Sequence, residues 1–130
     1  VPGCFESLAS GAAIGAAGRE FGFANSREVF SAMQLGHAEA RAIIQRAVYA
    51  TAVAAWTILH TLMPERIILG GGLMDAHYAL FAEAIQQQIA RATLIPRGQI
   101  SVARAVLGNE AGLVGAASLV FALQKGEKPG

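Results

Sequence analysis

The segment that most constrains the fold covers residues 64–74 and reads Pro-Glu-Arg-Ile-Ile-Leu-Gly-Gly-Gly-Leu-Met. Pro64 closes the preceding helical pattern, because its ring and its missing N–H cannot continue a helix. The apolar run at residues 67–69 predicts a short strand buried on both faces of a parallel sheet. Three glycines follow at once and an amphipathic pattern begins soon after, so the segment predicts a strand, a turn and a helix.

The glycine turn allows two interpretations from the residues alone. Backbone without Cβ atoms can lie directly against a ligand. A helix N-terminus at the same point favours an anion such as phosphate, through its free N–H groups and its dipole. A tight turn that binds nothing needs the same residues, and glycine-rich turns are common. Both interpretations therefore stay open at this point.

The rest of the chain predicts a helix-rich α/β fold. Gly11 and Gly15 lie one helical turn apart in a segment of small residues at 5–20, which predicts close packing against another element. A short helix is expected over 26–35, beginning at Ser26. The longest helix is expected over 37–63, where apolar residues recur at helical spacing.

The elements after the glycine turn complete an alternating order. They are expected as a helix with Asp75 as its N-cap that reaches residue 92, a turn at 95–98, a strand within 99–105 and a helix over 111–123. This order indicates a crossover between two parallel strands. Two strands are few for a sheet, so we expect further strands from a missing segment or a partner chain.

Composition restricts the function. A chain of 130 residues fits one domain with a real core, and its net charge of +1 leaves no electrostatic footprint for nucleic acid or a membrane surface. Residues 47–63 contain no charged residue, but the stretch is marginal in length for a membrane span and rich in Ala and Thr. We therefore expect a buried core helix there, with Trp56 in the core, and no membrane partner.

The single cysteine, Cys4, excludes an internal disulfide and fits a reducing, cytoplasmic compartment. The first residues lack the basic and apolar regions of a secretory signal. The absence of an initiator methionine indicates a piece of a longer protein. His37 and His60 are expected at opposite ends of one helix, so they cannot share a metal ion.

Three segments carry a resemblance to a known family. Residues 3–11 (GCFESLASG), 63–73 (MPERIILGGGL) and 107–117 (LGNEAGLVGAA) resemble three motifs of the ROK family (repressor, open reading frame, kinase) in the right order and spacing. The resemblance covers nearly the whole chain, with residues 1–124 as a C-terminal ROK-type sugar kinase segment and 125–130 as a flexible tail. It implies the C-terminal half of an actin-like, ribonuclease-H-like ATPase fold, helix-rich with a short parallel sheet.

The resemblance also implies roles for particular residues. Gly70, Gly71 and Gly72 would lie against ATP, and Glu6 would accept hydrogen bonds from sugar hydroxyls. Cys4 matches the last cysteine of the family's structural zinc motif, whose other ligands are absent here. The phosphate loop and the catalytic aspartate of the family belong to the N-terminal half, so no catalytic base is expected in this chain.

Three hypotheses for function follow. The parent protein is an ATP-dependent, glucokinase-like sugar kinase that uses ATP, Mg²⁺ and a hexose or amino-hexose, as a homodimer with structural Zn²⁺. Alternatively, it is a ROK transcriptional repressor, in which the same fold senses a sugar and a separate domain binds DNA. A third alternative is a packing or dimerisation module without a ligand. The intact glycine triplet and Glu6 favour the kinase, and we expect the isolated chain to lack kinase activity.

Overall fold

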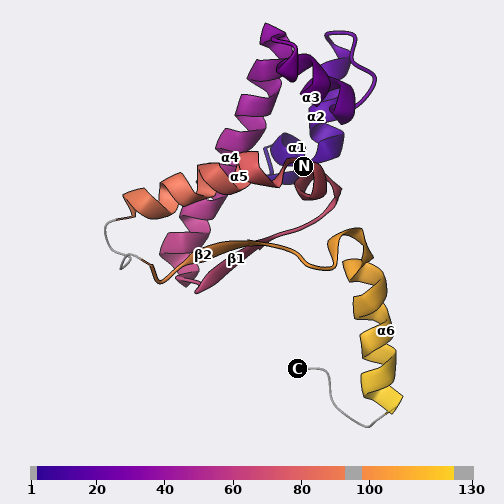
Figure 1. Ribbon diagram of the computed structural model, residues 1–130, viewed down its shortest axis with the longest axis vertical. Coiled ribbons are helices and arrows are strands. Elements are labelled where there is room, and N and C mark those ends of the chain that lie inside the picture. Colours follow the sequence, from indigo (N-terminus) through magenta and orange to yellow (C-terminus); the bar gives the residue numbers. More distant parts are fainter. Residues whose placement is uncertain (1–2, 93–97, 125–130) are drawn as a thin grey trace.

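The computed structural model describes residues 3–92 and 98–124. Most of the turn expected at 95–98, and the tail at 125–130, lie outside these residues. The described elements, shown in Figure 1, are α1 (Glu6–Ala9), α2 (Gly11–Arg19), α3 (Ser26–Gln34), α4 (Ala38–Leu62), β1 (Arg66–Leu69), α5 (Gly72–Arg91), β2 (Ser101–Arg104), the 3₁₀ turn η1 (Gly108–Glu110) and α6 (Ala111–Gln124). This order confirms the predicted α/β succession.

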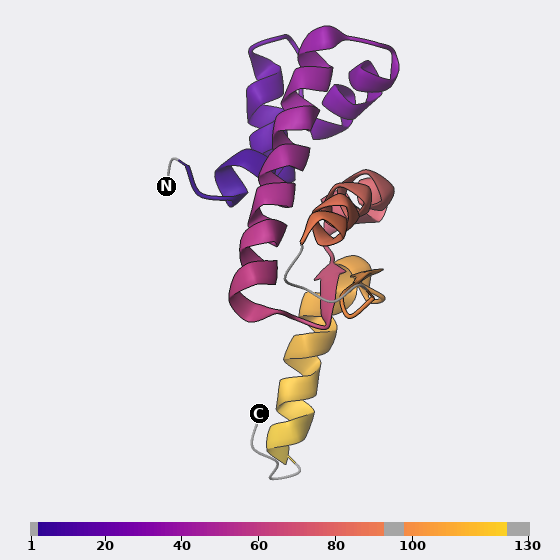
Figure 2. The same cartoon turned by 90° about the vertical axis from the view of Figure 1, so that its left-hand side faces the viewer.

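Helix α4 is the axis of the helical part of the molecule. The helices α1, α2 and α3 gather around its first half and α5 packs beside it (Figure 2). Its buried face includes small residues and branched side chains, namely Ala40, Ile43, Ile44, Ala47, Thr51, Ala52, Ala55 and Leu59. The hydroxyl of Thr51 donates to the carbonyl oxygen of Ala47 at 2.9 Å, so this buried polar group is satisfied.

The prediction of a core helix holds for one face of α4 only. By length and composition alone, α4 could also cross a membrane, although 39% of its most apolar stretch is buried inside the molecule. Trp56 was expected in the core, and this is wrong: it is 37% exposed and its ring lies 4.0 Å from that of His60. Helical spacing alone does not say how wide the covered face is, and the packed helices cover only part of α4.

The small residues of α2 pack closely against α3, as predicted. A Cβ atom on Gly15 would lie 3.1 Å from the backbone nitrogen of Ser26, and one on Gly18 would lie 2.4 Å from Cγ2 of Val29. Helix α3 begins at Ser26, as predicted, and its N-cap is Asn25, whose side chain accepts a hydrogen bond from the N–H of Glu28 at 3.1 Å.

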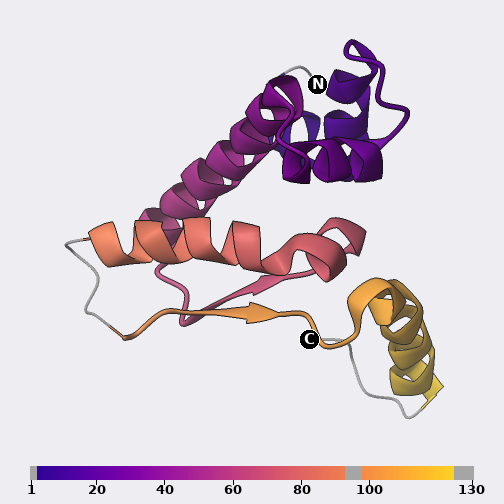
Figure 3. The same cartoon turned by 45° about the horizontal axis from the view of Figure 1, so that its top comes forward.

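Strands β1 and β2 pair in parallel, with Ile67 opposite Val102 and Leu69 opposite Arg104. Helix α5 connects them and runs along one face of the pair (Figure 3). The prediction that residues 67–69 are buried on both faces is wrong, because Ile68 is 63% exposed. Within residues 3–92 and 98–124 the sheet has two strands, so the face with Ile68 is left open.

Helix α5 begins earlier than expected. Its N-cap is Gly71, at φ 97°, and the helix starts at Gly72, so the prediction of Asp75 as the N-cap is wrong. A glycine at positive φ lets the chain turn from strand to helix without an intervening loop, which places Asp75 in the first turn. The helix has a kink at His77, whose ring stacks on Phe30 of α3 with centroids 3.5 Å apart.

Candidate functional site

The glycine turn lies at the carboxyl end of β1, where parallel α/β sheets usually bind ligands. The carbonyl oxygen of Gly71 accepts hydrogen bonds from the N–H groups of Met74 at 2.9 Å and Asp75 at 3.0 Å. The unpaired N–H groups and the dipole of the first turn of α5, which precedes the kink at His77, favour an anion at this point.

Gly70 and Gly71 disfavour a side chain for different structural reasons. Gly71 has a φ of 97°, which L side chains rarely adopt, and nothing lies within 4 Å of the position of its missing Cβ atom. A Cβ atom on Gly70 would lie 2.9 Å from Cβ of Ala105, just after β2. Gly70 is therefore needed for packing between the two strand ends, whereas Gly71 leaves open space above the turn.

The cavity at this turn brings Glu6 and the glycine triplet together. It has a volume of about 390 Å³, and one wall comes from the turn and the start of α5 while the other comes from α1 and the start of α2. Its lining residues are Phe5, Glu6, Ala9, Ser10, Gly11, Gly70, Gly71, Gly72, Leu73 and Met74. The residues predicted from the sequence for the sugar and for the nucleotide therefore line one cavity.

The position of Glu6 follows from a break between two helices. Ser10 has an extended backbone (φ −77°, ψ 157°), and its hydroxyl caps α2 by accepting a hydrogen bond from the N–H of Ala13 at 3.1 Å. This break makes α1 a separate single turn that begins with Glu6, an exposed residue. Its carboxylate forms no ion pair and no side-chain hydrogen bond with residues 3–92 and 98–124. It is therefore free to accept hydrogen bonds from a ligand.

An ion pair beside the turn was not predicted from the sequence. Arg104, the last residue of β2, donates a hydrogen bond to the carbonyl oxygen of Asp75 and lies 3.8 Å from its carboxylate. The same carboxylate lies 3.3 Å from the position of a Cβ atom on Gly108. The strand register brings these residues together, since it places Arg104 opposite Leu69 directly before the glycine turn.

Cys4 lies near this cavity in sequence but does not line it. The thiol is free and exposed, and hydrogen bonds from the backbone and the side chain of Ser7 hold its pKa below the ordinary value. No group of three His, Cys, Asp or Glu residues that could hold a metal ion occurs in the described part of the chain. A structural zinc ion needs about four ligands, so these residues do not fit zinc without further donors, and the role of Cys4 stays a prediction.

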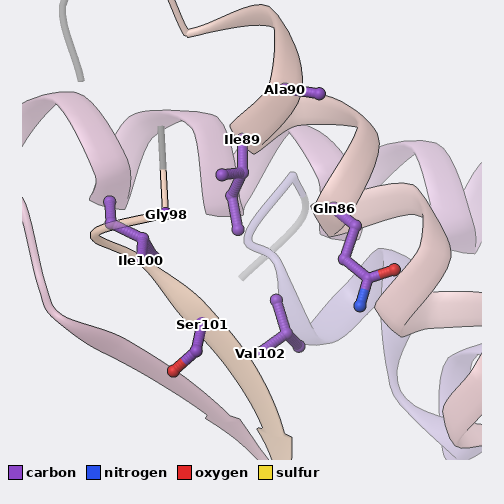
Figure 4. Close-up of a pocket in the computed structure, with 7 residues that line it drawn as sticks. All are labelled: Gln86, Ile89, Ala90, Gly98, Ile100, Ser101 and Val102. Atoms are coloured by element: carbon purple, nitrogen blue, oxygen red, sulfur yellow. The ribbon is translucent and has the colours of Figure 1, made fainter. Parts of the chain in front are cut away.

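A larger cavity lies at the opposite end of the strands. It has a volume of about 580 Å³ and lies between α5 and β2, with Gln86 and Ile89 on the helix side and Ser101 and Val102 on the strand side (Figure 4). None of its lining residues carries a formal charge, and none was predicted as a site residue. It also lies at the amino end of β2, away from the edge where ligands of α/β sheets bind.

Comparison with known proteins agrees with the fold. The model of the ROK family matches residues 1–122. The ROK hexokinase of Thermus thermophilus has a TM-score of 0.72 and 28% sequence identity, over 95% of this chain and 42% of that one. A ROK family glucokinase from Streptomyces griseus, solved in complex with glucose and AMPPNP, has a TM-score of 0.67 and 24% identity, over 92% of this chain and 45% of that one.

Proteins that are similar to this chain in sequence are also named as enzymes. The bifunctional enzyme NanE/NanK of Brucella melitensis is 34% identical over 115 residues, which are 88% of this chain and 21% of the relative. A glucokinase of Halalkalibacterium halodurans is 29% identical over 91% of this chain and 41% of its own length. The chain therefore spans less than half of each of these relatives, and their names give no support to the repressor alternative.

Proposed function

The chain belongs to the ROK family, and from this premise we propose that it forms one part of an ATP-dependent sugar kinase. In this proposal the glycine turn and the N-terminus of α5 contact the phosphates of ATP, and Glu6 accepts hydrogen bonds from hydroxyl groups of a hexose or amino-hexose. The observation that carries the proposal is the shared cavity, which Glu6 and Gly70–Gly72 both line.

The chemistry assigned to each residue follows from its surroundings. Phosphoryl transfer depends mainly on positioning and on stabilising charge at the transferred group. The free N–H groups of α5 supply donors for phosphate oxygens, and the open space above Gly71 lets the nucleotide approach the backbone. Mg²⁺ would enter bound to the nucleotide phosphates, and we assign it to no residue.

The proposal includes no catalytic base in this chain. The family resemblance places the base and the phosphate loop in the part of the fold that these 130 residues do not contain. We therefore expect the isolated chain to bind a nucleotide weakly and to phosphorylate no sugar.

Nuclear magnetic resonance of the ¹⁵N-labelled 130-residue chain tests the proposal. AMPPNP with Mg²⁺ should shift the amide signals of residues 70–74, and glucose should shift those of residues 5–11. Gly71→Ala should abolish the AMPPNP shifts, because a side chain at φ 97° distorts the turn. Gly115→Ala is the matched control, since nothing lies within 4 Å of its Cβ position.

Two outcomes would contradict the proposal. If AMPPNP shifted only the signals of residues that line the cavity beside Gln86 and Val102, the nucleotide site would be at the wrong end of the strands. If Gly71→Ala and Gly115→Ala changed AMPPNP binding equally, the glycine turn would have no specific role in it.

A further inference from the structure

Residues 70–74 form one wall of the cavity that the proposed function assigns to the nucleotide. The first end of this wall is fixed to the end of β2. A Cβ atom on Gly70 would lie 2.9 Å from Cβ of Ala105, and the N–H of Ala105 donates to the carbonyl oxygen of Leu69 at 2.8 Å. The position where the chain enters the wall is therefore set by close packing and by the backbone bonds of the strand pair.

The second end of the wall is held by Arg104, the residue directly before Ala105. Its guanidinium donates a hydrogen bond to the backbone carbonyl oxygen of Asp75, the residue that follows the wall, and lies 3.8 Å from the carboxylate of the same residue. A hydrogen bond from a charged donor is stronger than one between neutral groups. Two consecutive residues at the end of β2 thus contact both ends of the wall.

The rest of α5 fixes the second end only in part. His77 has a φ of −130° and a ψ of 24°, which lie outside the helical range, so α5 is kinked there. A kink marks a disturbed part of the hydrogen-bond ladder that keeps a helix straight. Beyond the kink, the hydroxyl of Tyr78 donates to the carbonyl oxygen of Val102 at 3.3 Å. Strand β2 therefore contacts α5 on both sides of the kink, through Arg104 before it and through Val102 after it.

Arg104 reaches the wall from outside the cavity. Neither Arg104 nor Asp75 is among the residues that line the cavity. The carboxylate of Asp75 also lies 3.3 Å from the position of a Cβ atom on Gly108, so the ion pair borders η1 as well. An effect of Arg104 on a ligand in the cavity must therefore pass through the wall.

We propose that Arg104 is a positioning residue for the nucleotide: its hydrogen bond to the carbonyl oxygen of Asp75 holds residues 70–74 in the direction that lets their backbone fit against the phosphates of ATP. The inference rests on the proposed function, because it concerns the same cavity. Phosphoryl transfer depends mainly on positioning, so a wall that moved about the kink at His77 would bind the nucleotide less tightly. A cation is suited to this place because it stabilises the carbonyl end of a helical turn.

Titration of the ¹⁵N-labelled 130-residue chain with AMPPNP and Mg²⁺ measures the effect on binding. Arg104→Met removes the donor, keeps an unbranched side chain and should raise the Kd for AMPPNP by about fivefold or more. Arg66→Met is the matched control, because it removes the same charge from the opposite end of the sheet, where Arg66 pairs with Ser101. It should raise the Kd by less than about twofold, since a distant exposed charge is screened by salt.

Residual dipolar couplings of the chain without a ligand measure the direction of the wall. In the unmodified chain, the amide couplings of residues 72–76 and 78–91 should fit the kinked helix described above with one alignment. Arg104→Met should turn or loosen residues 72–76 relative to residues 78–91, so that the couplings no longer fit. Arg66→Met should leave the fit unchanged.

Three outcomes would contradict the inference. Equal Kd values for the two methionine variants would remove the specific role of Arg104 and leave the proposed function standing. Weaker AMPPNP binding by Arg104→Met with unchanged couplings would mean that Arg104 contacts the nucleotide itself and does not act through the wall. If AMPPNP left the signals of residues 70–74 of the unmodified chain unchanged, both the proposed function and this inference would be wrong.

Discussion

Helices α4 and α6 are both rich in apolar residues, yet they differ in what surrounds them. Helix α4 buries one face against α1, α2, α3 and α5, and Leu59 on this face is fully buried. Helix α6 extends away from the rest of the molecule (Figures 1 and 2), and large apolar side chains on it are exposed, among them Leu113 at 70% and Phe121 at 63%. An apolar composition thus predicts that a helix packs against other elements. Among the described residues, α4 packs in this way and α6 does not.

The pattern of apolar residues agrees with this difference. Helix α4 has one buried side and one exposed side. Helix α6 has apolar residues on all sides, namely Leu113, Val114, Leu119, Val120 and Phe121. A helix that is apolar on every side belongs to an interior. The predictions below test whether the helical part is a self-sufficient core while α6 adds little to the stability of this chain, starting from the largest expected effect.

Truncation of a phenylalanine should affect the two regions very differently. Phe81 on α5 is fully buried, and Phe81→Ala should lower the free energy of unfolding by about 3–5 kcal/mol. Phe121→Ala on α6 removes a side chain that is 63% exposed and should change it by less than about 0.5 kcal/mol. Urea denaturation followed by circular dichroism measures both values, and similar losses for the two variants would remove the distinction between the regions.

Addition of one methyl group should have opposite signs in the two regions. Gly18→Ala places a Cβ atom 2.4 Å from the side chain of Val29, which is fully buried, and should cost about 1–3 kcal/mol of unfolding free energy. Gly115→Ala on α6 meets open space and should raise stability by about 0.5–1 kcal/mol. The same denaturation experiment measures both, and a destabilising Gly115→Ala would reveal a packed neighbour of α6.

The ion pair between Asp75 and Arg104 connects the helical part with the segment that leads to α6. Asp75→Asn should cost no more than about 1 kcal/mol in unfolding free energy, because Arg104 is half exposed and the pair is 3.8 Å apart. Its specific effect should be faster amide exchange at residues 105–110. Glu83→Gln, an acid-to-amide change elsewhere on α5, is the control and should leave exchange at these residues unchanged.

The smallest expected effect concerns pH. Burial against α3 lowers the pKa of His77 below its ordinary value of 6.5, so the unfolded chain binds a proton more readily than the folded chain does. The stability due to neutral His77 is complete above pH 6.5 and is lost as pH falls from 6.5 through the lowered pKa. Denaturation at pH 7.5 and 5.5 should show a smaller pH difference for His77→Gln than for the unmodified chain, and an equal difference would contradict this assignment.

The sequence predicted the succession of elements well because each rests on a local signal. The strand and the turn follow from Pro64, the apolar run and the glycines, and the parallel pairing follows from the helix between the two strands. The match to the family model confirmed the family, and the solved relatives confirmed the fold class. The start of α5 was misplaced because Asp75 has a typical capping side chain, whereas Gly71 begins the helix through its backbone conformation alone.

Features that depend on distant partners were harder to predict. Hydropathy indicated that Trp56 and Ile68 should be covered, but it does not identify the neighbour that covers them. The contact between Asp75 and Arg104 depends on the register of two strands that are far apart in sequence. The family resemblance singled out Glu6 and the glycine triplet, and the cavity between them adds the geometry that the motifs alone lacked.

The distance along the chain between the two walls of this cavity has a consequence for synthesis. Glu6 and Gly70 are separated by 64 positions, so at about 5–20 residues per second a ribosome makes the second wall roughly 3–13 s after the first. During that interval α1, a single turn of four residues, is too short to be stable alone and depends on its neighbours. The nascent chain therefore contains α1 to α4 before it contains the second wall of the cavity.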